Sequence, residues 1–139
     1  MASVVIFGTG LYKPPHIVTN AELVVAFNAY AEKFNARHAA RIEAGEVEAM
    51  VGSSVEFIEK ASGIKQRYVI DKEGVLDPDR MRPFFAPRSD EQLSLMAEIA
   101  VAAAKDALAA AGKRGEDVDM VLCAVANMQR AYPAMAVEI

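Results

Sequence analysis

An alanine-rich helical segment followed by a continuous apolar run constrains the fold more than any other feature of this sequence. The apolar residues of the segment recur at helical spacing along one face: Leu93, Met96, Ala97, Ala100, Ala104, Ala107, Leu108 and Ala111. Ser89-Asp90-Glu91-Gln92 has the pattern of a capping box, so we expect the helix to begin there and to end at Gly112. The run from Asp119 to Ala126 predicts a strand covered on both faces, and the many alanines predict close packing of the helix against a sheet.

The residues at the start of the chain predict a strand, a loop and a long helix. Ser3–Phe7 is a short β-branched run that is typical of a buried strand. The prolines of Lys13-Pro14-Pro15 predict a loop, because proline interrupts both strand ladders and helices. Asn20 is expected to cap the helix, with Glu22 in its first turn and Gly45 at its end.

The middle of the chain predicts a second helix, a strand and a long loop. Ser53-Ser54-Val55-Glu56 has the pattern of a capping box, and Gly63 is expected to stop the helix that follows. Gln66–Ile70 predicts a short strand, the proline-interrupted stretch 71–89 predicts a loop, and Tyr132-Pro133 is expected to open a last helix. Strand, helices, helix and strand in this order predict an α/β fold with parallel strands and a right-handed crossover.

Composition narrows the class of protein. A chain of 139 residues has the length of one domain. Its net charge of −4 argues against nucleic acid as a partner, because phosphate binding needs a basic face. The sequence contains no apolar run long enough to span a bilayer, and its first residues lack the pattern of a signal peptide. The single cysteine cannot form an internal disulfide, which favours a reducing compartment and a cytoplasmic location.

The glycine pair, the cysteine and the histidines each suggest a site, and each fails a chemical test. Gly8-x-Gly10 lacks the third glycine of a dinucleotide-binding fingerprint, and prolines stand where its helix must begin. Cys123 lies inside the predicted strand, away from a helix N-terminus or a cation that would activate a thiol. His16 and His38 have no partner at metal-ligand or triad spacing. The sequence therefore predicts no catalytic residue, no metal site and no cofactor in this chain.

A basic interval in this acidic protein leaves two interpretations open. Its members are Lys60, Lys65, Arg67, Arg80, Arg82 and Arg88. Such side chains usually form a solvated surface. The alternative is a binding site for a phosphate-bearing ligand, since lysine and arginine supply charge-assisted hydrogen bonds.

Four segments, taken in order, resemble the β-ketoacyl-ACP synthase III family. They are Ile6-Phe7-Gly8-Thr9-Gly10-Leu11-Tyr12, Thr19-Asn20-Ala21-Glu22-Leu23, Ser62-Gly63-Ile64-Lys65-Gln66-Arg67, and the stretch from Ala103 through Ala126 to Tyr132-Pro133. Their order and the filled length between them make the resemblance specific, and it covers nearly all of the chain.

The resemblance implies an enzyme of which this chain is the amino-terminal part. The expected architecture is a partial half of a five-layered αβαβα, thiolase-like fold, with residues 1–139 forming a single partial domain, and the expected assembly is a homodimer. In the family, a cysteine takes the acyl group from acyl-CoA, and malonyl-ACP attacks it after losing carbon dioxide. By resemblance the cysteine, histidine and asparagine of this chemistry would follow Ile139, so the chain alone is expected to be inactive.

The resemblance also points to substrate-binding residues. It places Phe57, Lys65 and Arg67 at the entrance used by CoA or the phosphopantetheine arm, and Tyr132 near the acyl pocket of the partner in the dimer. Phe57 stands where the family has a tryptophan, and Ala61 where it has an arginine. The stretches 24–61 and 71–89 are longer than in the typical enzyme and resemble insertions in relatives that use medium or long acyl chains.

Two other interpretations remain beside the enzyme. The chain could be a non-catalytic half-fold module that binds a partner subunit. A Rossmann-like nucleotide-binding domain is the weaker alternative, because the glycine fingerprint fails.

Overall fold

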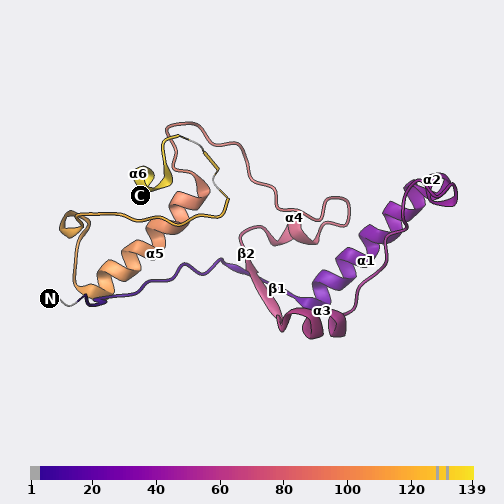
Figure 1. Cartoon of the computed structure of the whole chain (residues 1–139), viewed down its shortest axis with the longest axis horizontal. Helices are drawn as coiled ribbons and strands as arrows, with labels where there is room; N and C mark the ends of the chain where they lie inside the picture. Colours follow the sequence, from indigo (N-terminus) through magenta and orange to yellow (C-terminus); the bar gives the residue numbers. More distant parts are fainter. Residues whose placement is uncertain (1–3, 128, 131) are drawn as a thin grey trace. The chain divides into compact units, whose positions relative to one another are not determined.

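The computed structural model describes residues 4–127, 129–130 and 132–139, so Ser3 of the first predicted strand lies outside the described residues. The chain forms two compact units (Figure 1). We call Pro14–Ala86 the hairpin unit, and Met1–Lys13 together with Pro87–Ile139 the helix unit. The single domain over 1–139 stays a prediction.

A two-stranded antiparallel sheet organises the hairpin unit. Strand β1 (His16–Thr19) pairs with β2 (Gln66–Val69), and the register sets Val18 opposite Arg67. Val18 is fully buried. The predicted strand at Gln66–Ile70 is thus confirmed to within one residue, whereas β1 was not predicted because its residues follow two prolines. The two strands of this sheet run antiparallel and not parallel as predicted.

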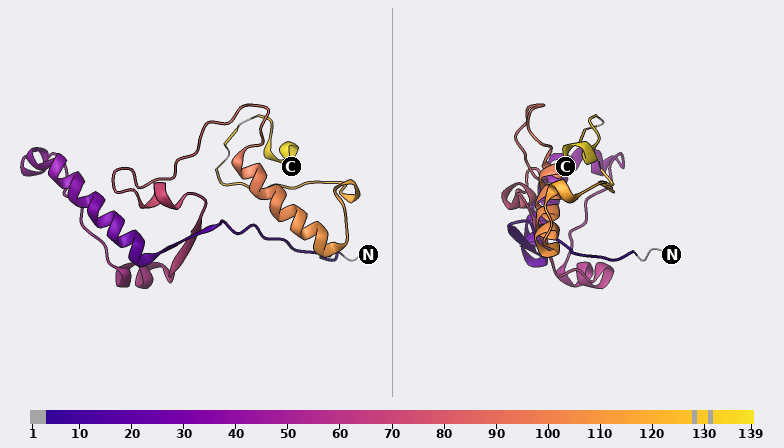
Figure 2. Two further views of the ribbon diagram at one scale, coloured as in Figure 1. Left: turned by 180° about the vertical axis from the view of Figure 1, so that it is seen from behind. Right: turned by 90° about the vertical axis from the view of Figure 1, so that its left-hand side faces the viewer.

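Helix α1 (Asn20–Arg37) continues directly from β1, as Figures 1 and 2 show. Its N-cap is Thr19, one residue before the predicted cap, because the Thr19 hydroxyl accepts a hydrogen bond from the backbone N–H of Glu22. The helix ends at Arg37 rather than at Gly45. His38 leaves the helical conformation with φ −110°, and the short helix α2 (Ala39–Glu43) follows before Gly45 turns the chain with φ +73°.

The remaining helices of the hairpin unit are short. Helix α3 (Val55–Ser62) ends as predicted at Gly63 with φ +70°. Its cap is Ser54, one residue later than in the predicted capping box, because the Ser54 hydroxyl accepts from the N–H of Phe57. It packs beside α1. Helix α4 (Lys72–Leu76) lies in the stretch that was predicted to be a loop. It forms there because Asp71 caps it, the Asp71 carboxylate accepting from the N–H of Gly74.

The helix unit is built on α5 (Leu95–Ala111), which ends as predicted at Gly112 with φ +62°. The helix begins later than predicted, because Ser94 and not Ser89 is its cap. Ser89 and Gln92 instead close a turn, in which the backbone N–H of Gln92 donates to the Ser89 carbonyl. A single 3₁₀ turn, η1 (Gly115–Asp117), follows α5, and α6 (Met135–Glu138) follows Tyr132-Pro133 as expected.

Two predicted strands are absent from the helix unit. Residues 4–7 and 119–126 belong to no strand, although both runs are apolar. Val4 is 98% exposed and Leu122 is 88% exposed. A strand requires a neighbour for its backbone N–H and C=O groups, and within the described residues neither run has one. The structure therefore mixes helices and strands as an α/β fold does, and the partial half of a five-layered, thiolase-like fold stays a prediction.

The alanine-rich face of α5 packs closely against a glycine-containing segment rather than against a sheet. A Cβ atom added to Gly10 would overlap the Ala103 carbonyl oxygen, and one added to Gly8 would overlap that of Ala107. The backbone N–H of Leu11 donates to the Asp106 carboxylate over 3.1 Å. The two glycines thus permit backbone-to-backbone contact with a helix, which is a packing role and not a phosphate-binding one.

Candidate functional site

The site begins with the cap of α1 in the hairpin unit. The backbone N–H and the hydroxyl of Thr19 both donate to Oε2 of Glu22 over 2.9 Å, while the Thr19 hydroxyl accepts from the Glu22 N–H. This reciprocal arrangement is a complete capping box. It explains why the segment Thr19-Asn20-Ala21-Glu22 needs a hydroxyl and a carboxylate three residues apart, and it leaves Asn20 free for another task.

Asn20 joins the start of α1 to the chain that enters β2. Its backbone N–H donates to the Lys65 carbonyl over 3.2 Å, and its side-chain amide donates to the Ile64 carbonyl over 2.7 Å. Its Oδ1 accepts from Nη1 of Arg67 over 2.9 Å. Asn20 is only 2% exposed. One buried residue therefore connects the two central segments of the family resemblance.

Arg67 lies on the buried face of the sheet that β1 and β2 form. It alternates with exposed neighbours along β2, is itself half-buried, and stands opposite the buried Val18. Within the described residues, its guanidinium has a neutral amide as its partner and forms no ion pair with a carboxylate. Several other arginines do pair with carboxylates, namely Arg41, Arg80, Arg88, Arg114 and Arg130.

Glu22 is the acidic residue of this region, and its carboxylate already has hydrogen-bonding partners. Its Oε1 accepts a 2.6 Å hydrogen bond from Nζ of Lys72, at the start of α4. This bond, together with the Thr19 bonds, lowers the pKa of Glu22 from 4.5 to about 2. The carboxylate is therefore charged at neutral pH. It forms an ion pair with Lys72 and accepts hydrogen bonds from Thr19 at the cap of α1.

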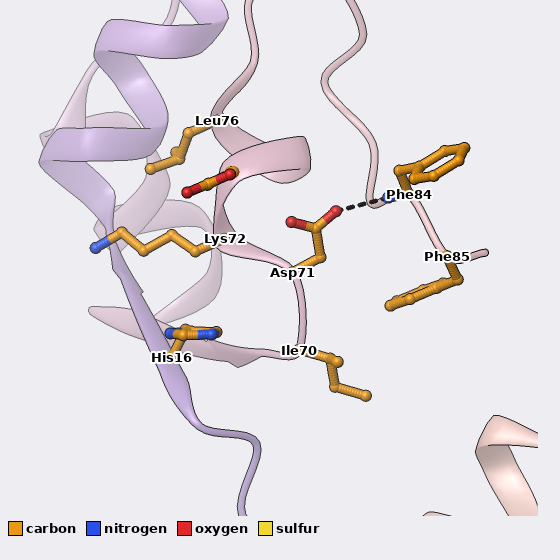
Figure 3. Close-up of a pocket in the computed structure, with 8 residues that line it drawn as sticks. His16, Ile70, Asp71, Lys72, Leu76, Phe84 and Phe85 are labelled. Atoms are coloured by element: carbon orange, nitrogen blue, oxygen red, sulfur yellow. Dashed lines mark hydrogen bonds between the residues drawn. The ribbon is translucent and has the colours of Figure 1, made fainter.

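A cavity of about 640 Å³ lies beside this network, between the end of β2 and α4 (Figure 3). Its lining is mixed aromatic, aliphatic and charged: His16, Ile70, Asp71, Lys72, Glu73, Leu76, Phe84 and Phe85. The Asp71 carboxylate accepts from the N–H of Gly74 over 2.9 Å and from that of Phe84 over 2.7 Å. These two donors lower the pKa of Asp71. The Asp71 carboxylate thus holds the backbone of Phe84, one of the two aromatic residues that line the cavity. The volume of the cavity is in the range of small-molecule binding sites.

The predicted substrate-binding residues are divided between the two units. Phe57, Lys65 and Arg67 belong to the hairpin unit, where Phe57 is 66% exposed on the first turns of α3 and Lys65 is exposed just before β2. Tyr132 belongs to the helix unit and is 90% exposed. Among these residues, the structure ties Arg67 to Asn20. The binding roles of all four residues stay predictions.

Groups that could react or bind metal do not gather in the described part of the chain. Cys123 is partly exposed in an irregular segment, and not in a strand as predicted. His16 lies in β1 rather than in a loop, and His38 stacks on Phe34 at 4.3 Å while its Nδ1 contacts the Phe34 carbonyl. No set of three or more His, Cys, Asp or Glu residues in the described ranges could hold a metal ion. The helices of these same ranges are also too short or too polar to cross a bilayer.

Sequence reasoning missed two further asparagines on α1. Asn28 exchanges hydrogen bonds of 2.8 and 3.1 Å with the backbone of Ser53, and Asn35 does the same with Met50 at 2.8 and 2.9 Å. Each side chain pairs with both the N–H and the C=O of one residue, as a neighbouring strand would. Asn20, Asn28 and Asn35 stand about two turns apart on one side of α1, and this spacing was the available signal.

The chain matches proteins of known name. It is 52% identical over 114 residues to the "Beta-ketodecanoyl-[acyl-carrier-protein] synthase" of Pseudomonas aeruginosa, covering 82% of this chain and 33% of that protein. It is 34% identical over 94 residues to the "Beta-ketoacyl-[acyl-carrier-protein] synthase III" of Allorhizobium ampelinum, covering 68% of this chain and 23% of the relative. The protein of that name from Paramagnetospirillum magneticum is 31% identical over 134 residues, covering 96% of this chain and 28% of the relative. No family model matches the chain.

These relatives define a class, the β-ketoacyl-[acyl-carrier-protein] synthases. Within that class, the chain is homologous to the β-ketoacyl-ACP synthase III proteins, which confirms the resemblance seen in its four segments. The chain spans about a third of the length of the first of these relatives and less of the others.

Proposed function

We propose that this chain is the amino-terminal part of a synthase that condenses an acyl-CoA primer with malonyl-ACP in fatty-acid or related biosynthesis. The observation that carries the proposal is the 52% identity to the β-ketodecanoyl-ACP synthase. The structure supports a binding role for this part, because the hairpin unit presents a cation and a small-molecule cavity, whereas its described residues contain no activated nucleophile.

The reaction divides between an acyl transfer and a condensation. The thiol of a cysteine elsewhere in the enzyme would take the acyl group and release CoA. Malonyl-ACP would lose carbon dioxide to give an enolate, which attacks the acyl carbonyl and expels the cysteine thiolate. The product is a β-ketoacyl-ACP that is two carbons longer than the primer. This part of the chain would hold the pantetheine-bearing ligands while that chemistry proceeds.

The primer we propose is a medium-length acyl chain. The name of the Pseudomonas aeruginosa relative specifies a ten-carbon β-ketoacyl product, which corresponds to an eight-carbon primer plus the two carbons of the malonyl unit. The long stretches 24–61 and 71–89 agree with the insertions expected of an enzyme for such chains. A cytoplasmic homodimer, as in the family, completes the proposal.

The test is a condensation assay on the intact gene product. Octanoyl-CoA and malonyl-ACP should give 3-oxodecanoyl-ACP, detected by mass spectrometry, at a higher kcat/KM than acetyl-CoA gives the corresponding short product. Failure to condense any acyl-CoA would contradict the proposal and favour the non-catalytic module. Residues 1–139 alone should acquire no label from radiolabelled octanoyl-CoA, because Cys123 lies in an irregular segment and not in the first turn of a helix, where a thiol would be activated.

A further inference from the structure

We propose that Asn20 is a positioning residue, which holds Arg67 as an unneutralised cation for the phosphate of a pantetheine-bearing ligand. This inference rests on the proposed function and adds to it a residue for which neither the resemblance nor the comparisons give a role. It follows from the hydrogen bonds of Asn20, from the charge of Arg67, and from the bonds that hold the Glu22 carboxylate to Lys72 and Thr19.

The orientation of the Asn20 amide is fixed by its partners. Its NH₂ group must face the Ile64 carbonyl, which only accepts, and its oxygen must face the Arg67 guanidinium, which only donates. Because the residue is 2% exposed and its own backbone N–H is tied to Lys65, the amide has no alternative arrangement among its described neighbours. The oxygen that holds Arg67 is therefore preorganised by the turn before β2.

A neutral partner orients a guanidinium without cancelling its charge. A carboxylate in the position of the Asn20 oxygen would form an ion pair and leave no net charge for a ligand. Glu22, two residues after Asn20, is held by Lys72 and by Thr19. Asp71, four residues after Arg67, accepts from the backbone N–H groups of Gly74 and Phe84. Arg67 thus keeps its positive charge, unlike the arginines that pair with carboxylates elsewhere in the chain.

The guanidinium also keeps most of its hydrogen-bonding capacity. Arginine carries five N–H donors in a planar fork, and in the described structure Nη1 of Arg67 alone has a protein acceptor. The remaining donors suit two oxygens of a phosphate group, which arginine binds in a bidentate manner. Since Arg67 is half-buried, solvent and salt weaken this attraction less than at an exposed site.

Calorimetric titration of the intact protein tests the inference with three probes of decreasing phosphate content. Coenzyme A, 4′-phosphopantetheine and pantetheine separate the phosphates of the nucleotide end from the phosphate of the pantetheine arm, and pantetheine has none. Asn20→Ala and Arg67→Ala should each weaken binding of the phosphate-bearing probes about tenfold and leave pantetheine unchanged, as expected for a lost hydrogen bond to a charged group. The double variant should bind no more weakly than either single variant, because Asn20 acts through Arg67.

A matched control comes from the same helix. Asn28→Ala removes an amide that also holds a distant backbone segment, through Ser53, and it should leave the affinity for every probe unchanged. If Asn20→Ala does not fold, as judged by circular dichroism, Asn20→Asp replaces it. The aspartate keeps the size of the side chain but neutralises Arg67, and it should weaken phosphate binding to the same extent as Arg67→Ala.

The outcomes separate this inference from the proposed function. Independent, additive losses in the two alanine variants, or wild-type affinity in Asn20→Asp, would overturn the positioning role even in an enzyme that condenses octanoyl-CoA normally. An Arg67→Ala variant that binds all three probes like the wild type would overturn it by removing Arg67 from the ligand. Only the absence of condensation activity would contradict the proposed function itself.

Discussion

The hairpin unit and the helix unit differ in what binds the backbone of their irregular segments. In the hairpin unit, side chains take the place of missing strand partners: Asn20, Asn28 and Asn35 on α1, and Asp71 before α4, bind the backbone of distant segments. In the helix unit, α5 is well formed, yet the apolar runs at 4–7 and 119–126 have no strand partner among the described residues.

The difference shows that polar side chains can satisfy the backbone groups of another segment, whereas an apolar run cannot satisfy its own. The carboxylate or amide of one residue pairs with an N–H or a C=O and so completes an extended segment without a second strand. A run of valine, leucine and methionine offers only apolar area, so its backbone depends on a neighbour that this part of the fold does not provide. We therefore expect the helix unit, rather than the hairpin unit, to associate with other chains.

The largest expected effect is on association. Exposed apolar runs without strand partners recruit other chains, so residues 1–139 should sediment as a species heavier than the 15.0 kDa monomer, or aggregate. Leu122→Asp places a charge in the exposed run and should shift the distribution toward the monomer. Sedimentation equilibrium over a hundredfold range of concentration measures both.

The hairpin unit provides a control for this prediction. Val25 is 72% exposed on α1 of the hairpin unit, so Val25→Asp introduces the same charge into the other unit and should leave the association unchanged. Equal effects of the two variants would show that association does not depend on the helix unit. A stable monomer in the wild type would contradict the prediction outright.

How much of this fold the sequence could predict depended on the range of the interactions involved. The ends of α3 and α5 were predicted because Gly63 and Gly112 act on residues within one turn. The prediction of the start of α5 was wrong because Ser89 and Gln92, which have the spacing of a capping box, close a turn, while Ser94 caps the helix without a glutamate or glutamine three residues later. The strands at 4–7 and 119–126 were wrong because hydrophobicity indicates burial but does not supply a partner.

The candidate site shows the same limit. Charge and resemblance drew attention to Arg67 from the sequence alone. Its partner Asn20 is 47 residues away, and the role expected of Asn20 from the sequence was to cap the helix that it begins. A contact between two polar residues at such a separation leaves no periodic pattern, so its prediction required the β1–β2 register.

The second prediction concerns stability in the helix unit. Gly10→Ala should lower the free energy of unfolding by about 1–3 kcal/mol, because the added Cβ overlaps the backbone of Ala103 and the segment must move away from α5. Urea unfolding in the Leu122→Asp background measures the change. Gly115→Ala is the matched control, since no heavy atom lies within 4 Å of a Cβ at Gly115. Equal stabilities of the two variants would contradict close packing at Gly10.

The third prediction concerns the asparagines of the hairpin unit. Asn35→Ala leaves the N–H and the C=O of Met50 without their partner, which should cost about 1–2 kcal/mol in the free energy of unfolding. Glu32→Ala, at an exposed position on the same helix, should change the stability little. If Asn35→Ala unfolds at the urea concentration of the Glu32 control, the amide does not substitute for a strand partner, and the contrast between the units disappears.

The smallest expected effect is the pH dependence that Glu22 contributes to the hairpin unit. Its pKa is lowered from 4.5 to about 2 by the Lys72 bond and the Thr19 bonds. A carboxyl group whose pKa is depressed in the folded state stabilises that state fully above the unfolded pKa, and the stabilisation is lost as the pH falls through 4.5 toward 2. Glu22→Gln keeps an oxygen for the cap but does not titrate, so the difference in urea midpoint between wild type and variant should be largest above pH 5 and shrink as the pH falls below about 4.

Glu56, Asp71 and Asp79 also have lowered pKa values, but they titrate alike in both proteins and cancel in the difference. A difference in midpoint that stays constant between pH 6 and pH 2.5 would show that Glu22 titrates with its ordinary pKa and that Lys72 does not hold it in solution.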